Sequence, residues 1–190
     1  MDNEVAAGNT TSTLGHLALG LTLLAFGIGS TGVIDNVAAS DAAGLATWVG
    51  GVALFLVGLL ALRAGNGGEG TAYSALGAFW FTWGTGVGGD AGSSEAAGLF
   101  LLLWALLALT LTVAASGSGL LGQGVYGLLC VALLLLGTGA LMDNGGLAKA
   151  GGWVAAVAGL AAWYGATAAV AHWPTSVGRR AAGRGVTATG

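Results

Sequence analysis

The sequence predicts an all-α membrane protein of six transmembrane helices, built as three tandem two-helix hairpins in a pseudo-threefold arrangement. Of the 190 residues, 55% are hydrophobic and only 7% are charged, whereas a soluble domain is about 25% charged. A turn motif also recurs: a Thr-Gly pair followed closely by an aspartate begins at Thr31, Thr85 and Thr138. Self-similarity at a roughly fixed period indicates a tandem architecture.

Each helix is predicted from an uncharged tract that reaches the roughly 20 residues needed to cross a bilayer. The tract over residues 96–142 would form a helix about twice as long as a hydrocarbon core is thick, so we expect it to fold back at residues 116–119, which read SGSG. The predicted helices are residues 14–34, 42–63, 70–88, 96–115, 119–142 and 148–172. Residues 1–13 and 173–190 are expected to be a cytoplasmic N-terminal segment and a cytoplasmic tail.

The basic residues predict the orientation in the membrane. An even number of spans puts both termini on one side, and four of the five basic residues fall on that side: Arg63, Arg179, Arg180 and Arg184. Lys149 alone falls on the other side. Because loops rich in Lys and Arg stay in the cytoplasm, we expect a multi-pass protein of the cell membrane with both termini cytoplasmic.

Several function classes lack support in the sequence. No enzyme motif or phosphate-binding loop is present, and no His, Cys and carboxylate residues have metal-ligand spacing, so we expect no enzyme, catalytic residue, cofactor, metal or nucleic-acid partner. No predicted span carries a charged residue at its centre, which argues against a charge-coupled pump. A channel or carrier for small neutral or weakly acidic molecules remains.

Three of the predicted helices begin on the cytoplasmic side with hydroxyl and amide side chains. Their N-termini, if they converge, could hold a carboxylate without Lys or Arg, or the polar groups could serve only as caps. Each helix then carries a stripe that turns from polar to apolar with depth, as a vestibule leading to a hydrophobic constriction would, although leucine stripes also serve packing. The predicted vestibule is His16, Asn66, Thr71, Tyr73, Ser74, Gln123 and Tyr126, and the predicted pore constriction is Leu19, Leu76 and Leu129.

Residues 65–83, GNGGEGTAYSALGAFWFTW, resemble the acetate uptake transporter family, which includes succinate–acetate permeases. The positions that match the family motif are Gly65, Asn66, Thr71, Ala72, Gly77, Phe79 and Trp80, with Tyr73 in place of a phenylalanine. The resemblance implies six helices around a substrate path, a homo-hexamer in the lipid bilayer, and transport of acetate and related small monocarboxylates. It also implies a narrow hydrophobic gate, at positions that match Leu19, Leu76 and Leu129.

Two departures from the family pattern keep other functions open. Residues 11–16, TSTLGH, lack both prolines of the family's helix-1 motif, and Leu76 replaces the gate tyrosine and so removes a hydroxyl group. The leading interpretation is a transporter or channel for small monocarboxylates. The alternatives are a structural or partner-binding membrane protein of the same fold that does not transport, and a channel for small neutral solutes such as urea.

Overall fold

The computed structural model describes residues 2–37, 39–87, 92–117 and 119–173, and in this part of the chain the helical segments join into six rods. The first rod is α1 (Asp2–Thr31). The second joins η1 (Ala39–Ala42), α2 (Ala43–Leu45), the π-helix η2 (Ala46–Ala53) and α3 (Leu54–Arg63). The third joins α4 (Gly67–Thr82) and the π-helix η3 (Trp83–Val87), and the fourth joins α5 (Ser94–Ala114) and η4 (Ala115–Gly117). The last two are α6 (Leu120–Leu141) and α7 (Gly145–Ala171).

These rods confirm the all-helical fold, and each corresponds to one of the expected spans. Within the described residues, five helices are long and apolar enough to cross a membrane: Thr10–Thr31, Ala46–Arg63, Ser94–Gly117, Leu120–Leu141 and Gly145–Ala171. The helix α4 falls short because it has 16 residues and opens with the polar, glycine-rich turn GGEG. The first rod also begins at Asp2 rather than near residue 14, and residues 174–190 of the expected tail lie outside the described part.

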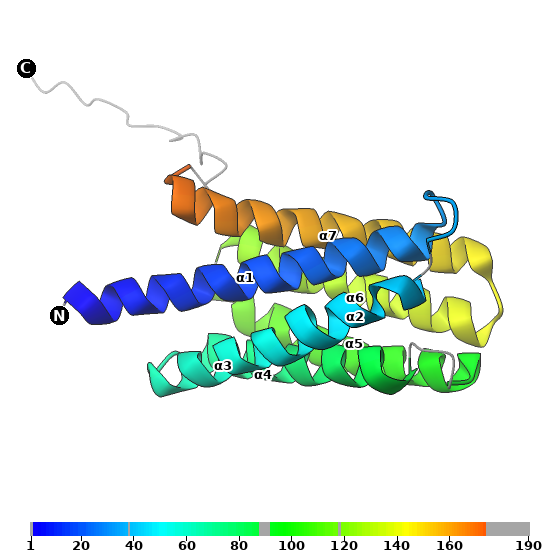
Figure 1. The fold of residues 1–190 in the computed structure, drawn as a ribbon, viewed down its shortest axis with the longest axis horizontal. Helices are drawn as coiled ribbons and strands as arrows, with labels where there is room; N and C mark the ends of the chain where they lie inside the picture. The colour runs from blue at the N-terminus through cyan, green and yellow to red at the C-terminus, as the bar shows by residue number, and fades with distance from the viewer. Residues whose placement is uncertain (1, 38, 88–91, 118, 174–190) are drawn as a thin grey trace, which may run out of the picture.

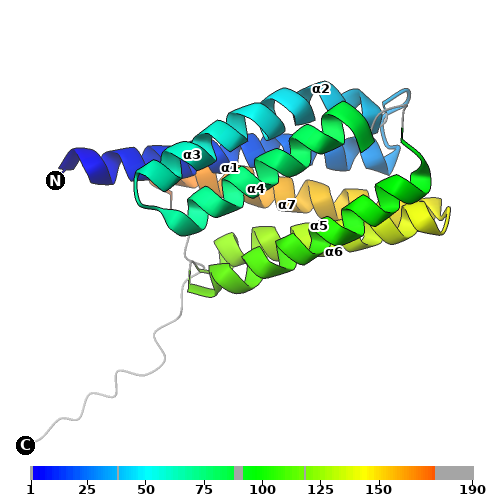
Figure 2. The same ribbon diagram turned by 90° about the horizontal axis from the view of Figure 1, so that it is seen from below.

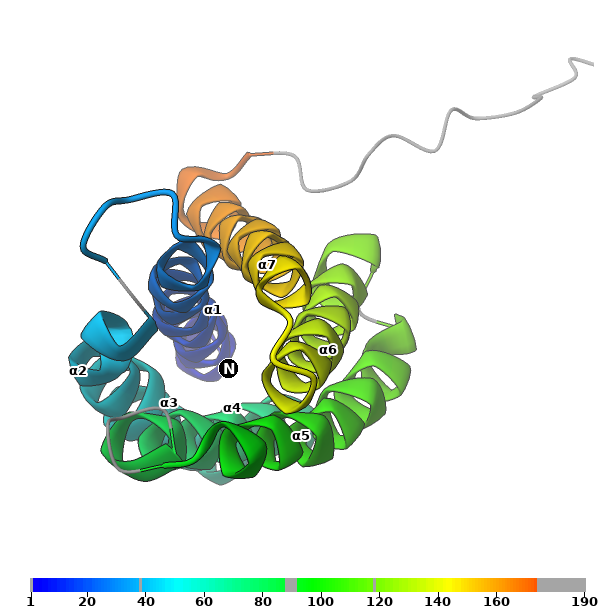
Figure 3. The same ribbon diagram turned by 90° about the vertical axis from the view of Figure 1, so that its right-hand side faces the viewer.

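The rods form a ring in the order α1, α7, α6, α5, α4 and α3, which closes where α3 and η2 meet α1 (Figure 3). The beginnings of α1, α4 and α6 and the ends of α3, α5 and α7 lie at one end of the bundle (Figures 1 and 2). The three Thr-Gly segments lie at the opposite end. Two short connections at the first end contain Gly65 and Gly119, with φ of 82° and 89°, a conformation that suits glycine because it has no Cβ.

The closest helix pairs are mostly not the pairs that the expected hairpins would form. The pairs α1–α7, α3–α4 and α5–α6 pack closely, and each joins the second helix of one expected hairpin to the first helix of another. Within the hairpins, α6 and α7 also pack closely, but α4 and α5 barely touch. The tandem-hairpin and pseudo-threefold arrangement therefore stays a prediction.

The interior is apolar, and the hydroxyl groups on the helices are largely satisfied locally. Thr22 donates to the Ala18 carbonyl at 2.8 Å and Thr112 donates to the Ala108 carbonyl at 2.7 Å, as expected where no water is available to bond them. The outer face of α5 presents Leu99, Leu103 and Leu106, each more than half exposed. Such a surface suits contact with lipid or with another subunit.

Candidate transport site

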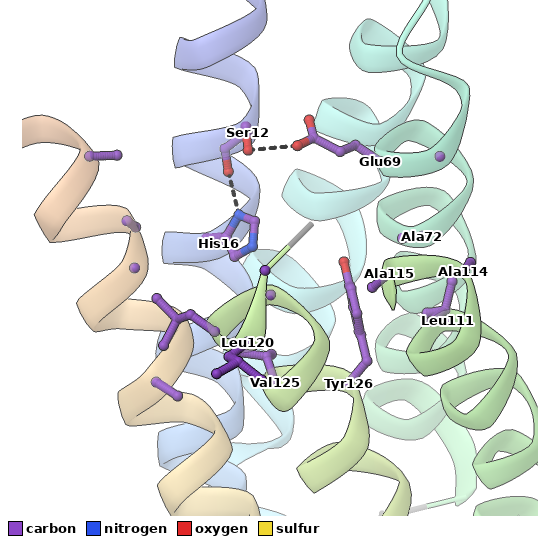
Figure 4. A pocket seen from close by; sticks show the side chains of 18 of the residues that line it. Ser12, His16, Glu69, Ala72, Leu111, Ala114, Ala115, Leu120, Val125 and Tyr126 are labelled. Carbon is purple, nitrogen blue, oxygen red and sulfur yellow. Dashed lines mark hydrogen bonds between the residues drawn. The ribbon is translucent and has the colours of Figure 1, made fainter. Parts of the chain in front are cut away.

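A cavity of about 1370 Å³ lies at the end of the bundle where α1, α4 and α6 begin. Five of the six rods and the α5–α6 connection contribute to its wall, which is mostly alanine, glycine and leucine (Figure 4). The side chains with polar atoms in the lining are Ser12, Thr13, His16, Glu69, Ser116, Tyr126 and Tyr164. The cavity is therefore largely apolar, with polar groups concentrated between α1, α4 and α6.

A hydrogen-bonded group joins α1 to α4 at the cavity wall. The Ser12 hydroxyl donates to Glu69 Oε1 at 2.8 Å, and the Tyr73 hydroxyl donates to the Ser12 backbone carbonyl at 3.2 Å. The His16 Nδ1 atom lies 2.9 Å from the same carbonyl oxygen and 2.7 Å from the Tyr73 hydroxyl. The two rings meet edge to face with centroids 5.8 Å apart. The three side chains of this group that line the cavity, Ser12, His16 and Glu69, are thus each held by at least one hydrogen bond.

The helical repeat explains this arrangement. Ser12 and His16 are four residues apart on α1, and Glu69 and Tyr73 are four apart on α4, so each pair shares one face of its helix. Gly15 allows the two faces to approach, because a Cβ at that position would overlap the Tyr73 ring. The sequence TSTLGH, which departs from the family pattern, is therefore the segment that forms the α1 wall of the cavity.

The N-termini of α4 and α6 both border the cavity, through Gly68 and Glu69 on α4 and through residues 120–122 on α6. The helix α1 behaves differently, because it begins at Asp2, well before Ser12. The interpretation that three helix N-termini converge here is therefore wrong for α1. The polar residues at positions 9–13 continue the helix instead of starting it.

The predicted vestibule residues divide into two groups. His16 and Tyr126 line the cavity, whereas the other five are absent from its lining: Asn66, Thr71, Tyr73, Ser74 and Gln123. Tyr73 is fully buried and supports His16. Ser74 packs against Gly58 of α3, and Gln123 donates to the Thr112 carbonyl of α5 at 3.3 Å. Sequence reasoning missed Ser12 and Glu69, each of which lies one helical turn before a stripe residue and could have been found by that spacing.

The predicted constriction residues Leu19, Leu76 and Leu129 are 0%, 1% and 1% exposed and belong to the same buried cluster. Each follows a polar stripe residue by three positions, so each lies about one helical turn deeper than His16, Tyr73 or Tyr126. None of the three leucines faces the outside of the bundle. Their role as a constriction stays a prediction.

The family model for the GPR1/FUN34/yaaH family, a family of acetate transporters, matches residues 3–178 of the chain. The chain belongs to this family. Like other members it is a multi-pass membrane protein, and both the family and its structural neighbour are transporters or channels rather than enzymes.

Curated relatives in this family come from yeasts. The chain is 29% identical to "Ammonia transport outward protein 2" and 30% identical to "Accumulation of dyads protein 2", both of Saccharomyces cerevisiae, over 67% of the chain and 49% of each relative. It is 27% identical to "Glyoxylate pathway regulator" of Yarrowia lipolytica over 84% of the chain and 63% of that relative. The chain thus spans about half the length of the two Saccharomyces cerevisiae relatives.

Among solved structures, the fold is similar to that in "Structure of the bacterial acetate channel SatP". The TM-score is 0.77 at 25% sequence identity, and the alignment covers 85% of this chain and 92% of the other. The six-rod architecture is therefore similar to the fold of a known channel.

The residues that carry the family resemblance are mainly packing residues. A Cβ on Gly77 would lie 2.7 Å from the backbone nitrogen of Phe55, so Gly77 permits the close α3–α4 contact. Phe79 and Trp80 are fully buried in an aromatic cluster with Phe26, Trp83, Phe100 and Trp104. In the described part of the chain, no group of three or more His, Cys, Asp or Glu residues could hold a metal ion.

Proposed function

We propose that this protein is a channel or transporter for acetate and related small monocarboxylates, and that Leu19, Leu76 and Leu129 form the narrowest point of its path. One observation carries the proposal: a cavity with polar groups on α1, α4 and α6 lies one to two helical turns from buried leucines on the same three helices. The solved structure with the same fold is titled as an acetate channel, which supports the same substrate class.

The chemistry of the constriction favours the protonated form of the substrate. Leucine side chains offer no hydrogen bond, and burying an unpaired ionised carboxylate is very costly. The neutral acid should therefore pass more easily than the anion, and flux should rise as the pH falls toward the pKa of the substrate.

Flux of labelled acetate into proteoliposomes, with and without a pH gradient, tests this proposal. Leu76→Ala should widen the path and raise the flux, whereas Leu76→Trp should block it. Leu106→Ala is the matched control, because Leu106 is 62% exposed on the outer face of α5 and should transport like the parent. Parental flux in both Leu76 variants would contradict the constriction, and no acetate flux in any variant would favour a protein that does not transport.

A small neutral solute is the second candidate substrate. The name of one Saccharomyces cerevisiae relative specifies ammonia transport, and an apolar constriction passes neutral molecules more readily than ions. Urea and ammonia fluxes measured in the same vesicles distinguish this candidate, because a carboxylate path should pass acetate faster than either.

Orientation and assembly complete the proposal. The distribution of basic residues favours cytoplasmic termini. In a Cys130→Ala background, a cysteine at Ser93 should then react with an impermeant reagent from outside, and one at Ser116 should not.

The exposed apolar face of α5 and the family resemblance support a homo-hexamer. Mass measurement in mild detergent that finds only monomers would contradict the hexamer.

A further inference from the structure

Nε2 of His16 and the hydroxyl of Tyr126 are polar atoms at the cavity that have no protein hydrogen-bond partner among the described residues, as are the Ser116 hydroxyl and Oε2 of Glu69. The Tyr126 side chain is 8% exposed, and its hydroxyl opens into the cavity without a partner in the wall. Figure 4 shows this hydroxyl pointing into the space that the His16 ring borders. A hydroxyl donor and a ring nitrogen that both face the cavity and are not engaged by protein groups suit a ligand with oxygen atoms.

The hydrogen bonds of His16 determine which ring nitrogen carries the proton. The backbone carbonyl of Ser12 only accepts, and it lies 2.9 Å from Nδ1. An unprotonated Nδ1 could accept from the Tyr73 hydroxyl 2.7 Å away but would set its lone pair against the carbonyl oxygen. In contrast, Nδ1–H donates to that oxygen and leaves the Tyr73 hydroxyl to donate to it as well, at 3.2 Å. We therefore assign the neutral ring as the Nδ1–H tautomer, which leaves Nε2 as the nitrogen that a ligand can reach.

We propose that His16 and Tyr126 bind the carboxyl group of the substrate together with one proton. This site rests on the proposed function and specifies how that function selects its substrate. One carboxyl oxygen shares a proton with His16 Nε2, and the other oxygen accepts a hydrogen bond from the Tyr126 hydroxyl.

Sharing a proton with His16 prepares the substrate for the leucine constriction, which the neutral acid passes more easily than the anion. A carboxylic acid donates its O–H to the neutral Nε2; equivalently, a carboxylate accepts from Nε2–H of an imidazolium, and the two states differ only in which atom holds the proton. The substrate leaves toward the leucines as the neutral acid and His16 returns to its neutral tautomer. One proton thus enters the site and leaves it with each carboxylate.

The groups around His16 fit this role. From α4 it faces Tyr73, which contacts Nδ1, and Glu69, which is held by Ser12. From α6 and α7 the cavity presents Tyr126 and Tyr164. Glu69 is the one carboxylate in the described lining. Its negative charge disfavours a free acetate anion beside it, so the site favours the carboxyl group that arrives with its proton.

Nitrogen-15 NMR of the full-length protein in lipid nanodiscs tests this site. The chain has two histidines, so a His172→Gln variant labelled with [15N]histidine reports His16 alone. Without acetate, the spectrum should show a neutral Nδ1–H tautomer; titration with sodium acetate should shift the Nε2 signal toward its protonated value, whereas sodium chloride at equal ionic strength should not. Tyr126→Phe should weaken acetate binding about 10-fold, the effect of one hydrogen bond to a charged group.

Thr110→Val is the matched control, since it removes a hydroxyl from an exposed position on α5 outside the cavity lining and should bind acetate like the parent. A neutral Nε2–H tautomer, an Nε2 signal that acetate does not move, or parental binding in Tyr126→Phe would each overturn the proposal. A thermal unfolding scan of each variant identifies any loss of binding that is due to misfolding, and His16→Gln should fold but lose the pH dependence of acetate binding. Because the NMR titration needs no flux, a failure of this site is distinguishable from a failure of transport.

Discussion

The α1–α7 contact and the α4–α5 contact belong to the same ring of helices but are made in opposite ways. Between α1 and α7 the backbones touch: Gly20 faces Gly159 and Gly27 faces Gly152, and a Cβ on Gly27 would lie 2.5 Å from the backbone nitrogen of Ala156. Between α4 and α5 the backbones stay apart and aromatic rings fill the space, with Phe79 stacked on Phe100 at a centroid distance of 5.5 Å.

The difference indicates where the bundle tolerates change. A glycine contact excludes any added side chain and holds two helices at one distance, which is how small residues associate helices in membranes. An aromatic contact depends on side chains that adopt several rotamers, so the helices it joins are less strictly placed. The cavity lies between these two contacts, with α1 and α7 on one wall and α4 and α5 on another. We therefore expect substitutions to be severe at the first contact and graded at the second.

The largest loss of stability is expected for Gly27→Ala. The new methyl group would overlap backbone atoms of α7, which cannot move aside as the end of a side chain can, so the two helices must separate. Overpacking typically costs about 1–3 kcal/mol and occasionally more, and we expect a loss at the upper end of this range in thermal unfolding of the purified protein.

Gly127→Ala on α6 is the control for this prediction, because the nearest atom to its Cβ would be Thr112 Cγ2 at 3.6 Å, an ordinary contact. The control should match or exceed the parent in stability, since alanine favours a helix over glycine by about 1 kcal/mol. Equal unfolding temperatures for the two variants would contradict the inference that the α1–α7 contact leaves no room for a methyl group at Gly27.

A smaller effect is expected for Phe79→Leu in the α4–α5 contact. The substitution keeps an apolar side chain but removes the stacking partner of Phe100, so the loss should be about 1.5 kcal/mol. Phe81→Leu, on the same helix but 46% exposed, should change stability by less than about 0.5 kcal/mol. Equal losses in the two variants would mean that the aromatic stacking contributes nothing specific.

Local features of the fold could be predicted from the sequence, whereas the pairing of helices could not. Uncharged tracts and recurring turns are local features, and they located all six rods. Of the seven residues that the polar-to-apolar stripes selected as a vestibule, only His16 and Tyr126 line the cavity, and the roles of the stripe residues stay predictions. Which helices pack closely depends on shape complementarity between distant segments, such as Gly27 against Ala156, and no local pattern revealed that α3–α4 would pack more closely than α4–α5.

Glu69 illustrates the same limit within the site. From the sequence it is an acidic residue in the first turn of a helix, where it complements the helix dipole. Only the approach of α1, permitted by Gly15, brings the Ser12 hydroxyl to its carboxylate and makes it part of the cavity wall.

The smallest loss of stability is expected in the α5–α6 contact, where Gln123 Nε2 donates to the Thr112 carbonyl at 3.3 Å and the Cys130 thiol donates to the Ala105 carbonyl at 3.5 Å. Hydrogen bonds between membrane helices contribute about 0.6 kcal/mol on average, so Gln123→Leu should lower the unfolding temperature only slightly.

The Gln123→Leu variant also decides between two roles for this residue. If Gln123 binds substrate, as the stripe pattern predicts, Gln123→Leu should slow acetate uptake as much as Tyr126→Phe does. If it only links two helices, as its bond to α5 and its absence from the cavity lining favour, uptake should equal that of the parent while Tyr126→Phe remains impaired. Parallel uptake assays on the two variants at one pH make the comparison, and a slow Gln123→Leu variant of parental stability would place Gln123 in the vestibule after all.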